Sequence, residues 1–364
     1  MTLGNAGPPL KLTVYTERPD EKLYFERFGR QFGVELVERT EDPAVDTAHF
    51  AGGAPCVTII TTLVDAVLLE AFRERGVRFI STRSIGTDHI DLQAAARLGI
   101  RVGNVSYDPD AVSNYTVMLI LMAIRQVKNI ARLSVAGDFS LRHGVQGRNL
   151  RNLTVGVAGT GRIGKRVIEH LSSFGCPVLV YSHRRSLARR PGESGQEDVL
   201  AQKHARYVDW DEFLASSDII SLHLHPTPET YHIINRDAIA RMKDGVILVN
   251  TARGGLVDSE ALIEAVENGK VSGAALDVHE DELSLYYKDL RGQPLSNRSL
   301  AVLRSFPNVI VTPHTAFYTD QTVSDMVENT IRSCLHFANS ESNPWEVPLP
   351  DESGKPRLNS RGIP

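Results

Sequence analysis

The chain has 364 residues, a formal net charge of −4 at pH 7, and 42% hydrophobic and 23% charged residues. This length exceeds what one hydrophobic core usually serves, so we expect two domains of an ordinary soluble globular protein. Because acidic and basic residues nearly balance, the chain lacks the excess positive charge typical of proteins that bind nucleic acid or anionic membranes. The expected class of function is therefore chemistry on a small molecule.

The first third of the chain alternates between β-branched runs and helical patterns. We expect strands at residues 12–15, 57–60, 77–80 and 100–102, with helices at 63–74 and 91–98 between them. Such alternation predicts a parallel sheet with helices on both faces.

Residues 111–135 follow this first region, and their apolar positions leave few polar faces until Arg125. This pattern predicts a helix that must be buried, either in the core or in an interface between subunits. A homodimer formed through this helix is therefore expected.

The second half repeats the alternation more densely. Strands are expected at 154–158, 178–181, 219–224, 246–250, 272–276 and 309–312, with helices at 162–174, 259–267 and about 319–338. This pattern is typical of a doubly wound nucleotide-binding sheet.

Two segments interrupt the second half, and a polar tail follows it. Residues 186–206 are polar and predict a surface loop or a partly helical excursion. Residues 283–304, which include Tyr286 and Tyr287, fit either a plain connection or a lid, and the pattern leaves both open. The proline-rich tail, 346–364, is expected to be poorly ordered, with Trp345 holding it to the domain.

The three cysteines, Cys56, Cys176 and Cys334, lie far apart in apolar runs without metal-ligand spacing. We expect buried free thiols in a reducing cytosol and no metal site. No apolar run approaches the ~20 residues of a membrane span, and residues 1–9 lack a basic-then-apolar signal. A cytoplasmic location without membrane attachment is expected.

A glycine-rich run joins the strand expected at 154–158 to the helix expected after it. Its sequence is Gly159-Thr160-Gly161-Arg162-Ile163-Gly164. Gly159 permits a tight turn, Gly161 lets the backbone approach a pyrophosphate, and Gly164 lets the helix pack close to the sheet. The N–H groups at the helix N-terminus would bind the pyrophosphate, which favours a dinucleotide site over a purely structural turn.

The end of the next strand bears on the choice of dinucleotide. An NAD site usually places an acid there, whereas this strand runs into Ser182-His183-Arg184-Arg185. No carboxylate would repel a 2′-phosphate and two guanidinium groups could bind one, so we expect NADPH to be preferred and NADH to remain possible. The alternative is that Arg184 and Arg185 are solvated loop charges and that both cofactors are used.

Three residues near the ends of expected strands suggest hydride transfer to a 2-keto acid. Arg253 presents a planar cation that matches a carboxylate. His314 would act as general acid towards the keto oxygen, and Glu282 would raise the pKa of that imidazole. Each alone could be a surface arginine, a loop glutamate or a core histidine. Together, at strand ends where doubly wound folds bind ligands, they predict a catalytic trio.

At these residues the chain resembles the D-isomer specific 2-hydroxyacid dehydrogenase family, over residues 82–338. The matching stretches are 83–91, 159–164, 250–258, 274–282 and 312–319. Residues 314–319 and the Tyr286/Tyr287 connection resemble the D-lactate dehydrogenase branch, and 104–107 and 155–161 resemble its vancomycin-resistance type. The resemblance implies reduction of pyruvate to D-lactate, in a setting such as D-Ala-D-Lac cell-wall precursors in glycopeptide resistance.

The resemblance also implies roles for substrate-binding residues. The backbone N–H groups of Ile85 and Gly86 would hold the substrate carboxylate beside Arg253. Tyr107 and Phe317 would border its small side group, and Tyr107 would also hydrogen-bond the carboxylate.

Further residues are implied at the cofactor. Asp277 would lie near the nicotinamide amide, and Thr251 and Ala252 would line the ring. His225 stands where the family normally has a proline that abuts the cofactor. It would either touch the phosphates or face solvent, and the sequence leaves both open.

The fold implied by the family is α/β, with two Rossmann-like or flavodoxin-like doubly wound parallel-sheet domains and a cleft between them. Residues 1–108 with 319–345 would form a discontinuous substrate domain, and 109–318 the dinucleotide-binding domain.

Two other functions stay open: reduction of a larger branched 2-keto acid, and a dinucleotide-sensing corepressor that is not an enzyme.

Overall fold

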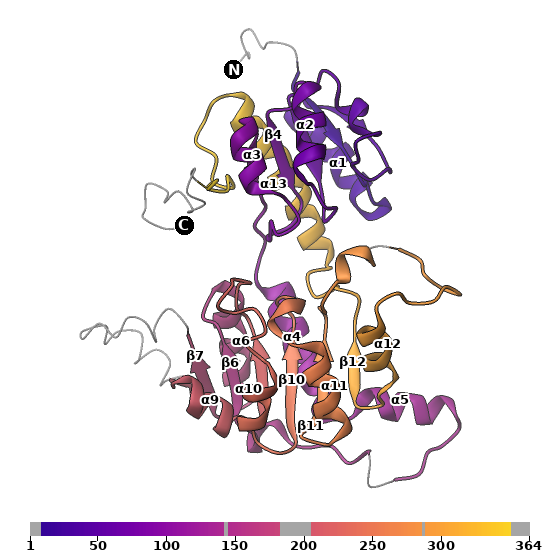
Figure 1. Cartoon of the computed structure of the whole chain (residues 1–364), viewed down its shortest axis with the longest axis vertical. Helices are drawn as coiled ribbons and strands as arrows, with labels where there is room; N and C mark the ends of the chain where they lie inside the picture. Colours follow the sequence, from indigo (N-terminus) through magenta and orange to yellow (C-terminus); the bar gives the residue numbers. More distant parts are fainter. Residues whose placement is uncertain (1–8, 142–144, 183–204, 286–287, 351–364) are drawn as a thin grey trace, which may run out of the picture. The chain divides into compact units, whose positions relative to one another are not determined.

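The structure is a computed structural model that describes residues 9–141, 145–182, 205–285 and 288–350. The chain divides into two compact units, residues 1–108 with 318–364 and residues 109–317 (Figure 1). Each unit contains one sheet in which every strand pairing is parallel. The predicted α/β class with two parallel sheets is confirmed.

The first unit is built on a five-stranded sheet of order β2-β1-β3-β4-β5. Its strands are β1 (Lys11–Val14), β2 (Glu35–Glu38), β3 (Cys56–Ile59), β4 (Phe79–Thr82) and β5 (Arg101–Gly103). Its helices are α1 (Pro19–Phe32), α2 (Ala66–Glu74), α3 (Leu92–Leu98) and α13 (Asp320–Ala338), with a 3₁₀ turn at Ala48–Ala51.

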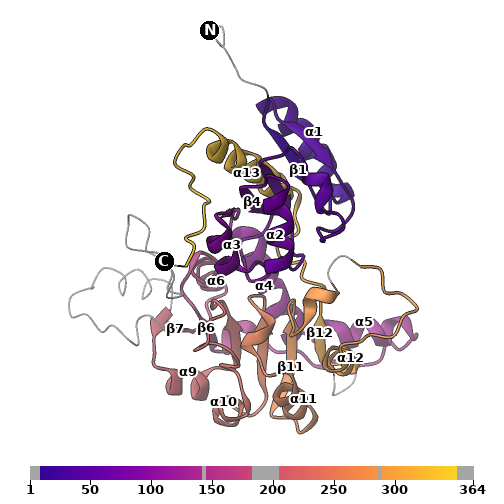
Figure 2. The same cartoon turned by 45° about the horizontal axis from the view of Figure 1, so that its top comes forward.

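Helices cover both faces of this sheet because its strands alternate their side chains between two apolar layers. Val14 packs in a layer with Phe25 of α1 and Val327 of α13. Tyr15 and Leu68 of α2 belong to the opposite layer. Helix α13 comes from the end of the chain and lies against α1 and β4 (Figure 2).

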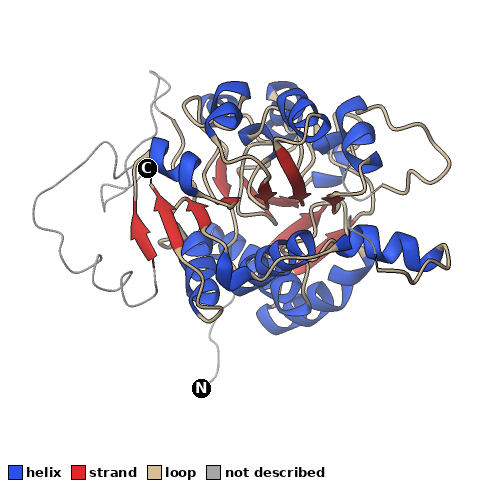
Figure 3. Ribbon diagram, turned by 90° about the horizontal axis from the view of Figure 1, so that it is seen from below, coloured by secondary structure: helices blue, strands red, loops and turns tan. Residues whose placement is uncertain are grey.

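The second unit is built on a seven-stranded sheet of order β12-β11-β10-β9-β6-β7-β8. Its strands are β6 (Val155–Ala158), β7 (Val178–Tyr181), β8 (Ala205–Tyr207), β9 (Ile219–Leu222), β10 (Val246–Asn250), β11 (Val271–Leu276) and β12 (Val309–Val311). Its helices are α4 (Asp110–Ile124), α5 (Val127–Val135), α6 (Arg162–Ser172), α9 (Trp210–Ser216), α10 (Arg236–Arg241), α11 (Ser259–Glu267) and α12 (Arg298–Ser305). Short 3₁₀ turns lie at Leu150–Asn152, Gly254–Leu256 and Glu282–Ser284. Figure 3 shows helices on both sides of the strands.

The order of this sheet reverses beside β6, the strand that precedes the glycine-rich run. Strand β6 pairs with β7 on one side and with β9 on the other. Ligands bind doubly wound sheets at the carboxyl ends of the strands where the order reverses, so a ligand site is expected after β6.

The prediction of a single buried helix over 111–135 was wrong. Helix α4 ends at Ile124 and α5 begins at Val127, because Gln126 takes a left-handed conformation with φ 56°. Helix α4 is buried against α6, whereas α5 has no buried residue and exposes Ile130 and Val135.

Other expected segments also changed. The excursion expected to 206 ends earlier, because Ala205–Tyr207 form the edge strand β8, while residues 183–204 lie outside the described residues. Helix α12 occupies the end of the 283–304 connection, and Tyr286 and Tyr287 are not described. Helix α1 and strand β2 had not been predicted. No helix in the described part of the chain is long and apolar enough to cross a membrane.

Candidate active site

The expected catalytic trio lies after three neighbouring strands of the seven-stranded sheet. Arg253 follows β10, Glu282 follows β11 and His314 follows β12, and β11 pairs with both β10 and β12. Because the strands are parallel, their carboxyl ends lie at one edge of the sheet. The fold thus brings residues separated by up to 61 positions to adjacent loops.

The Arg253 loop is shaped by a buried amide at the end of β10. The Asn250 side chain donates to the carbonyl oxygen of Arg253 at 2.8 Å and accepts from the N–H of Ala252 at 3.0 Å. A Cβ at Gly254 would stand 2.1 Å from the carbonyl group of His279. Only glycine allows so close an approach, which joins the Arg253 loop to the loop that carries Glu282.

His314 and Glu282 form a hydrogen-bonded pair. The Nδ1–H of His314 donates to Oε1 of Glu282 at 3.0 Å, and the N–H of His279 donates to Oε2 at 3.0 Å. The His314 ring meets the Phe317 ring edge-on, with 6.4 Å between centroids. Since the carboxylate engages Nδ1, the other ring nitrogen, Nε2, is the one that can exchange a proton with a substrate.

The buried Asp277 carboxylate holds the loop that presents His314. Its oxygens accept from the N–H of Thr315 at 2.9 Å, the N–H of Ala316 at 2.8 Å and the hydroxyl of Thr312 at 2.6 Å. His314 itself has φ 52°, a left-handed main-chain conformation that residues other than glycine rarely adopt. Asp277 stabilises this turn, a role that the sequence pattern did not suggest.

The geometry of the glycine-rich run fits a dinucleotide. Gly159 has φ 104°, and a Cβ there would lie 2.3 Å from the carbonyl oxygen of His223. A Cβ at Gly164 would lie 2.1 Å from the carbonyl oxygen of Gly159, whereas Gly161 faces open space. Helix α6 begins at Arg162 without a side-chain cap, so its first N–H groups are oriented to bind an anion.

Other residues expected at the cofactor lie after β7, after β10 and on α6. Ser182 directly follows β7, and the hydroxyl of Thr160 donates to its hydroxyl at 3.4 Å. His183, Arg184 and Arg185 are outside the described residues. The Thr251 hydroxyl is hydrogen-bonded to Thr116 of α4 at 2.8 Å, and Ile163 packs against the apolar layer beneath α6.

Two histidines follow β9, and they differ in environment. The side chain of His225 is exposed. The ring of His223 has Nε2 at 2.8 Å from the Ser221 hydroxyl, and burial lowers the pKa of His223 to about 4. Its buried Nδ1 has no hydrogen-bond partner in the described chain. His223, beside Gly159 and Gly164, is therefore a neutral ring at the glycine-rich loop that no sequence motif marks.

In the first unit, the loop after β4 is arranged to expose N–H groups. The carbonyl oxygen of Ile85 accepts from the Asn104 side chain at 2.9 Å, and that of Gly86 accepts from the Ser84 hydroxyl at 2.7 Å. The N–H groups of Ile85 and Gly86 donate to no atom of the described residues. Two adjacent N–H groups are suited to bind a carboxylate when the carbonyl oxygens of the same residues already accept hydrogen bonds elsewhere.

A buried ion pair anchors this loop. Arg83 has no exposed surface, and its guanidinium donates to Oε1 of Glu21 at 2.8 Å and to the carbonyl oxygens of Tyr15 and Thr16 at 3.0 and 2.9 Å. The half-buried Tyr107 lies on the segment that follows Asn104. No group of three or more His, Cys, Asp or Glu side chains among the described residues could hold a metal ion.

Comparisons with known proteins find similar proteins that match along most of the chain. Residues 117–316 match the family model described as D-isomer specific 2-hydroxyacid dehydrogenase, NAD binding domain. The chain is 45% identical over 327 residues to the D-specific alpha-keto acid dehydrogenase of Enterococcus faecium, covering 90% of this chain and 96% of that protein.

Two further similarities bear on substrate and cofactor. The aromatic 2-oxoacid reductase of Clostridium sporogenes is 39% identical over 332 residues, covering 90% of this chain and 96% of the reductase. The solved D-lactate dehydrogenase of Aquifex aeolicus, complexed with NAD and lactic acid, is similar with a TM-score of 0.78 and 33% identity, covering 91% of this chain and 96% of the solved one.

Proposed function

The chain belongs to the D-isomer specific 2-hydroxyacid dehydrogenase family and is an oxidoreductase, and from that premise we propose that it reduces pyruvate to D-lactate. The observation that carries this proposal is the pairing of His314 with Glu282 beside the Arg253 loop. A cation for the substrate carboxylate and an oriented acid for its keto oxygen are the two groups that this reduction requires.

In the proposed reaction, Arg253 and the N–H groups of Ile85 and Gly86 bind the substrate carboxylate. The glycine-rich loop 159–164 would hold a nicotinamide dinucleotide, which would supply the hydride for the keto carbon. His314 gives the proton on Nε2 to the keto oxygen, which completes the hydroxyl group. Glu282 holds the ring by Nδ1 and stabilises the imidazolium that forms when the reaction runs in reverse.

Pyruvate is favoured by the resemblance of residues 314–319 to the D-lactate dehydrogenase branch and of residues 104–107 and 155–161 to its vancomycin-resistance type. Formation of D-lactate for D-Ala-D-Lac cell-wall precursors is the proposed physiological setting. An aromatic 2-keto acid is the second candidate, because the Clostridium sporogenes aromatic 2-oxoacid reductase shares 39% identity with this chain. Reduction of a branched 2-keto acid is the third candidate.

We propose that NADPH is preferred over NADH. The support is the residue directly after β7, where Ser182 stands in place of an acid that would repel a 2′-phosphate. Arg184 and Arg185 would then bind that phosphate. Asp277, Thr251 and Ala252 are proposed to lie near the nicotinamide, and His225 to lie near the phosphates.

We propose that one domain, residues 1–108 with 319–345, binds the substrate and that the other, residues 109–318, binds the dinucleotide. The protein is proposed to be cytoplasmic.

The protein is also proposed to form a homodimer. Support for the dimer comes from exposed apolar side chains on and after α5, with Val135 91%, Phe139 82% and Leu141 100% exposed. Changing Leu141 to Asp should convert the dimer to a monomer, which sedimentation equilibrium would measure. An unchanged mass would contradict this interface.

The experiment that tests the function is the initial rate of NADPH and NADH oxidation with four 2-keto acids as acceptors. Pyruvate, 2-ketobutyrate, 2-ketoisocaproate and phenylpyruvate span small, branched and aromatic side groups. Fastest turnover of pyruvate with NADPH is expected. Faster turnover of phenylpyruvate or 2-ketoisocaproate would replace pyruvate by the second or third candidate, and absence of turnover with all four would overturn the proposal.

A further inference from the structure

The segment that follows α13 forms a short antiparallel ladder with β5 in the first unit. Gly103 pairs with Glu346 in an isolated antiparallel bridge. The N–H of Asn104 donates to the carbonyl oxygen of Trp345 at 2.9 Å, and the N–H of Val347 donates to that of Val102 at 2.9 Å. Residues 346 and 347, which the sequence pattern had assigned to a polar tail, are thus hydrogen-bonded to the edge strand β5.

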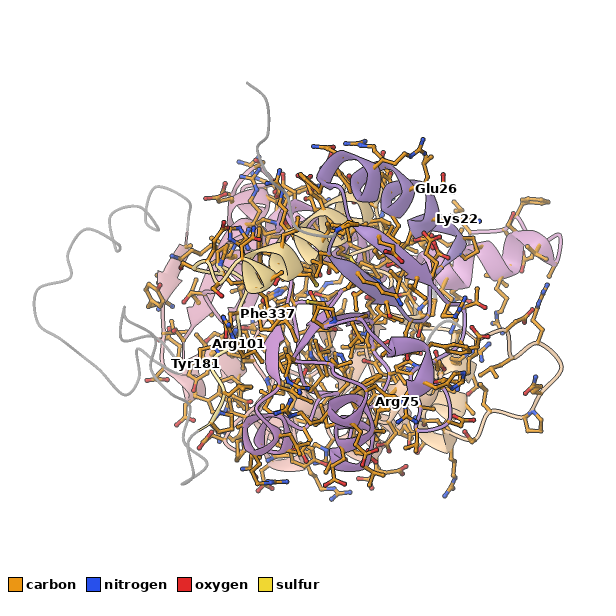
Figure 4. The ribbon with its side chains drawn as sticks, turned by 90° about the horizontal axis from the view of Figure 1, so that it is seen from above. Lys22, Glu26, Arg75, Arg101, Tyr181 and Phe337 are labelled. Carbon is orange, nitrogen blue, oxygen red and sulfur yellow. The ribbon has the colours of Figure 1, made fainter. Side chains whose placement is uncertain are left out.

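Side chains add to this ladder on both sides. Arg101 donates through Nε to Oε1 of Glu346 at 2.6 Å. Its guanidinium carbon lies 5.1 Å from the centre of the Phe337 ring on α13, and Figure 4 shows the two side chains next to each other. The indole N–H of Trp345 donates to the hydroxyl of Ser106 at 3.1 Å.

The approach of α13 to β5 leaves no room for a side chain at Gly103. A Cβ there would stand 2.7 Å from the Phe79 ring and 2.7 Å from the hydroxyl of Ser333. The Asn343 amide donates to that same hydroxyl at 2.9 Å, and its oxygen accepts from the N–H of Trp345 at 3.1 Å. Asn343 therefore fixes the main chain of Trp345, and the hydrogen bond from the indole to Ser106 is an additional contact.

The segment held in this way carries substrate-binding groups. Asn104 ties back the carbonyl of Ile85, whose N–H is proposed to bind the substrate carboxylate. Val105 donates its N–H to the carbonyl oxygen of Ser84 at 3.2 Å. Ser106 has its carbonyl oxygen fixed by the side chain of Asn329 at 2.6 Å, and Tyr107 is the next residue.

We propose that Trp345 is a positioning residue for substrate binding. Its carbonyl oxygen accepts from the N–H of Asn104, whose side chain holds the Ile85 loop. Its indole N–H donates to Ser106, which precedes Tyr107 and so holds that residue in place. This inference rests on the proposed function, because it assumes that the Ile85 loop and Tyr107 bind the keto acid.

Trp345→Phe tests the indole N–H alone. It keeps an aromatic ring and leaves the main-chain ladder of Asn104 and Val347 intact, while Ser106→Ala removes the acceptor of the same hydrogen bond. The matched control is Trp210→Phe, which changes the chain's other tryptophan, in the second unit.

The measured quantities are kcat and the KM values for the 2-keto acid and for the dinucleotide. Loss of one hydrogen bond should raise the keto-acid KM about two- to tenfold in Trp345→Phe and in Ser106→Ala. The dinucleotide KM should stay unchanged. The double variant should be no weaker than either single variant, because both remove the same bond. Trp210→Phe should leave the keto-acid KM unchanged.

Each other outcome contradicts a specific statement. An active wild-type enzyme whose keto-acid KM is unchanged by both substitutions would overturn this inference alone. Equal increases of the keto-acid and dinucleotide KM values would assign Trp345 a general structural role and also overturn it. A wild-type protein that reduces no 2-keto acid would overturn the proposed function together with this inference.

Discussion

His314 donates a hydrogen bond from Nδ1 to Oε1 of Glu282 at 3.0 Å, and the other oxygen of that carboxylate accepts from the main chain of His279. Both carboxylate oxygens are therefore engaged, so that the acid cannot rotate freely away from the ring. A carboxylate held in this way fixes the imidazole tautomer and leaves Nε2 for proton transfer.

Replacing Glu282 by Gln should lower kcat at least about tenfold, because the neutral amide no longer stabilises a charged imidazole. The amide oxygen can still accept from Nδ1 of His314, although the N–H of His279 loses its acceptor, so the dinucleotide KM should be preserved. Steady-state kinetics in both directions would measure the effect. A kcat equal to that of the wild type would show that Glu282 does not support His314.

Replacing His314 by Gln should lower kcat by about 10²- to 10⁴-fold even at saturating keto acid, since the general acid is lost. Dinucleotide binding, followed by quenching of protein fluorescence, should be unchanged. Equal loss of turnover and dinucleotide affinity would contradict the assignment of His314 as the acid.

Replacing Arg253 by Ala should raise the keto-acid KM by on the order of 10²-fold or more, because a charge-assisted contact with the carboxylate is lost. Arg253→Lys is the matched variant, and it should recover only part of the affinity, since an ammonium group cannot bind a carboxylate in the bidentate mode. Full recovery by Lys would argue against a planar contact.

Replacing Gly254 by Ala should destabilise the protein by about 1–3 kcal/mol and lower kcat/KM, because its Cβ would stand 2.1 Å from the His279 carbonyl group. Gly255 is the matched control, since a Cβ there would meet only the Tyr231 ring at an ordinary 3.4 Å. Thermal unfolding and keto-acid kinetics of the two variants would be compared. Equal effects at both positions would contradict the proposed close approach.

Burial, and then the neighbouring carboxyl group of Glu38, raise the pKa of Glu17 from its ordinary 4.5 to about 7. A raised folded-state pKa means that the folded protein binds more protons than the unfolded chain between these values, so stability is lost as pH rises from 4.5 to 7. Glu17→Gln should therefore unfold at a higher temperature than the wild type at pH 8 and not at pH 4. Because Glu17 is partly exposed, the gain should be on the order of 1 kcal/mol. Parallel melting curves at all pH values would contradict this prediction.

The sequence by itself was enough to single out the residues that we propose carry the chemistry. A glycine-rich run between a strand pattern and a helix pattern, and one arginine, one glutamate and one histidine near strand ends, are local features that a reader of the chain can find. Period and glycine placement likewise predicted most strands of both sheets, because buried parallel strands appear as continuous apolar runs.

Local pattern could not place Gln126, whose left-handed conformation divides the helix expected over 111–135, or β8, whose short polar strand forms only by pairing with β7. It also could not show what Asp277 binds, since its partners lie 35 to 39 residues away in sequence.

Only the tertiary structure decided how the distant parts meet. The parallel order β10, β11, β12 sets Arg253, Glu282 and His314 on adjacent loops, and the close approach permitted by Gly254 joins two of those loops. Trp345 reaches Ser106 across 239 positions of the chain. Such contacts depend on strand order and on the return of α13 to the first sheet, which are set by packing of the whole unit and leave no periodic signal in the residues themselves.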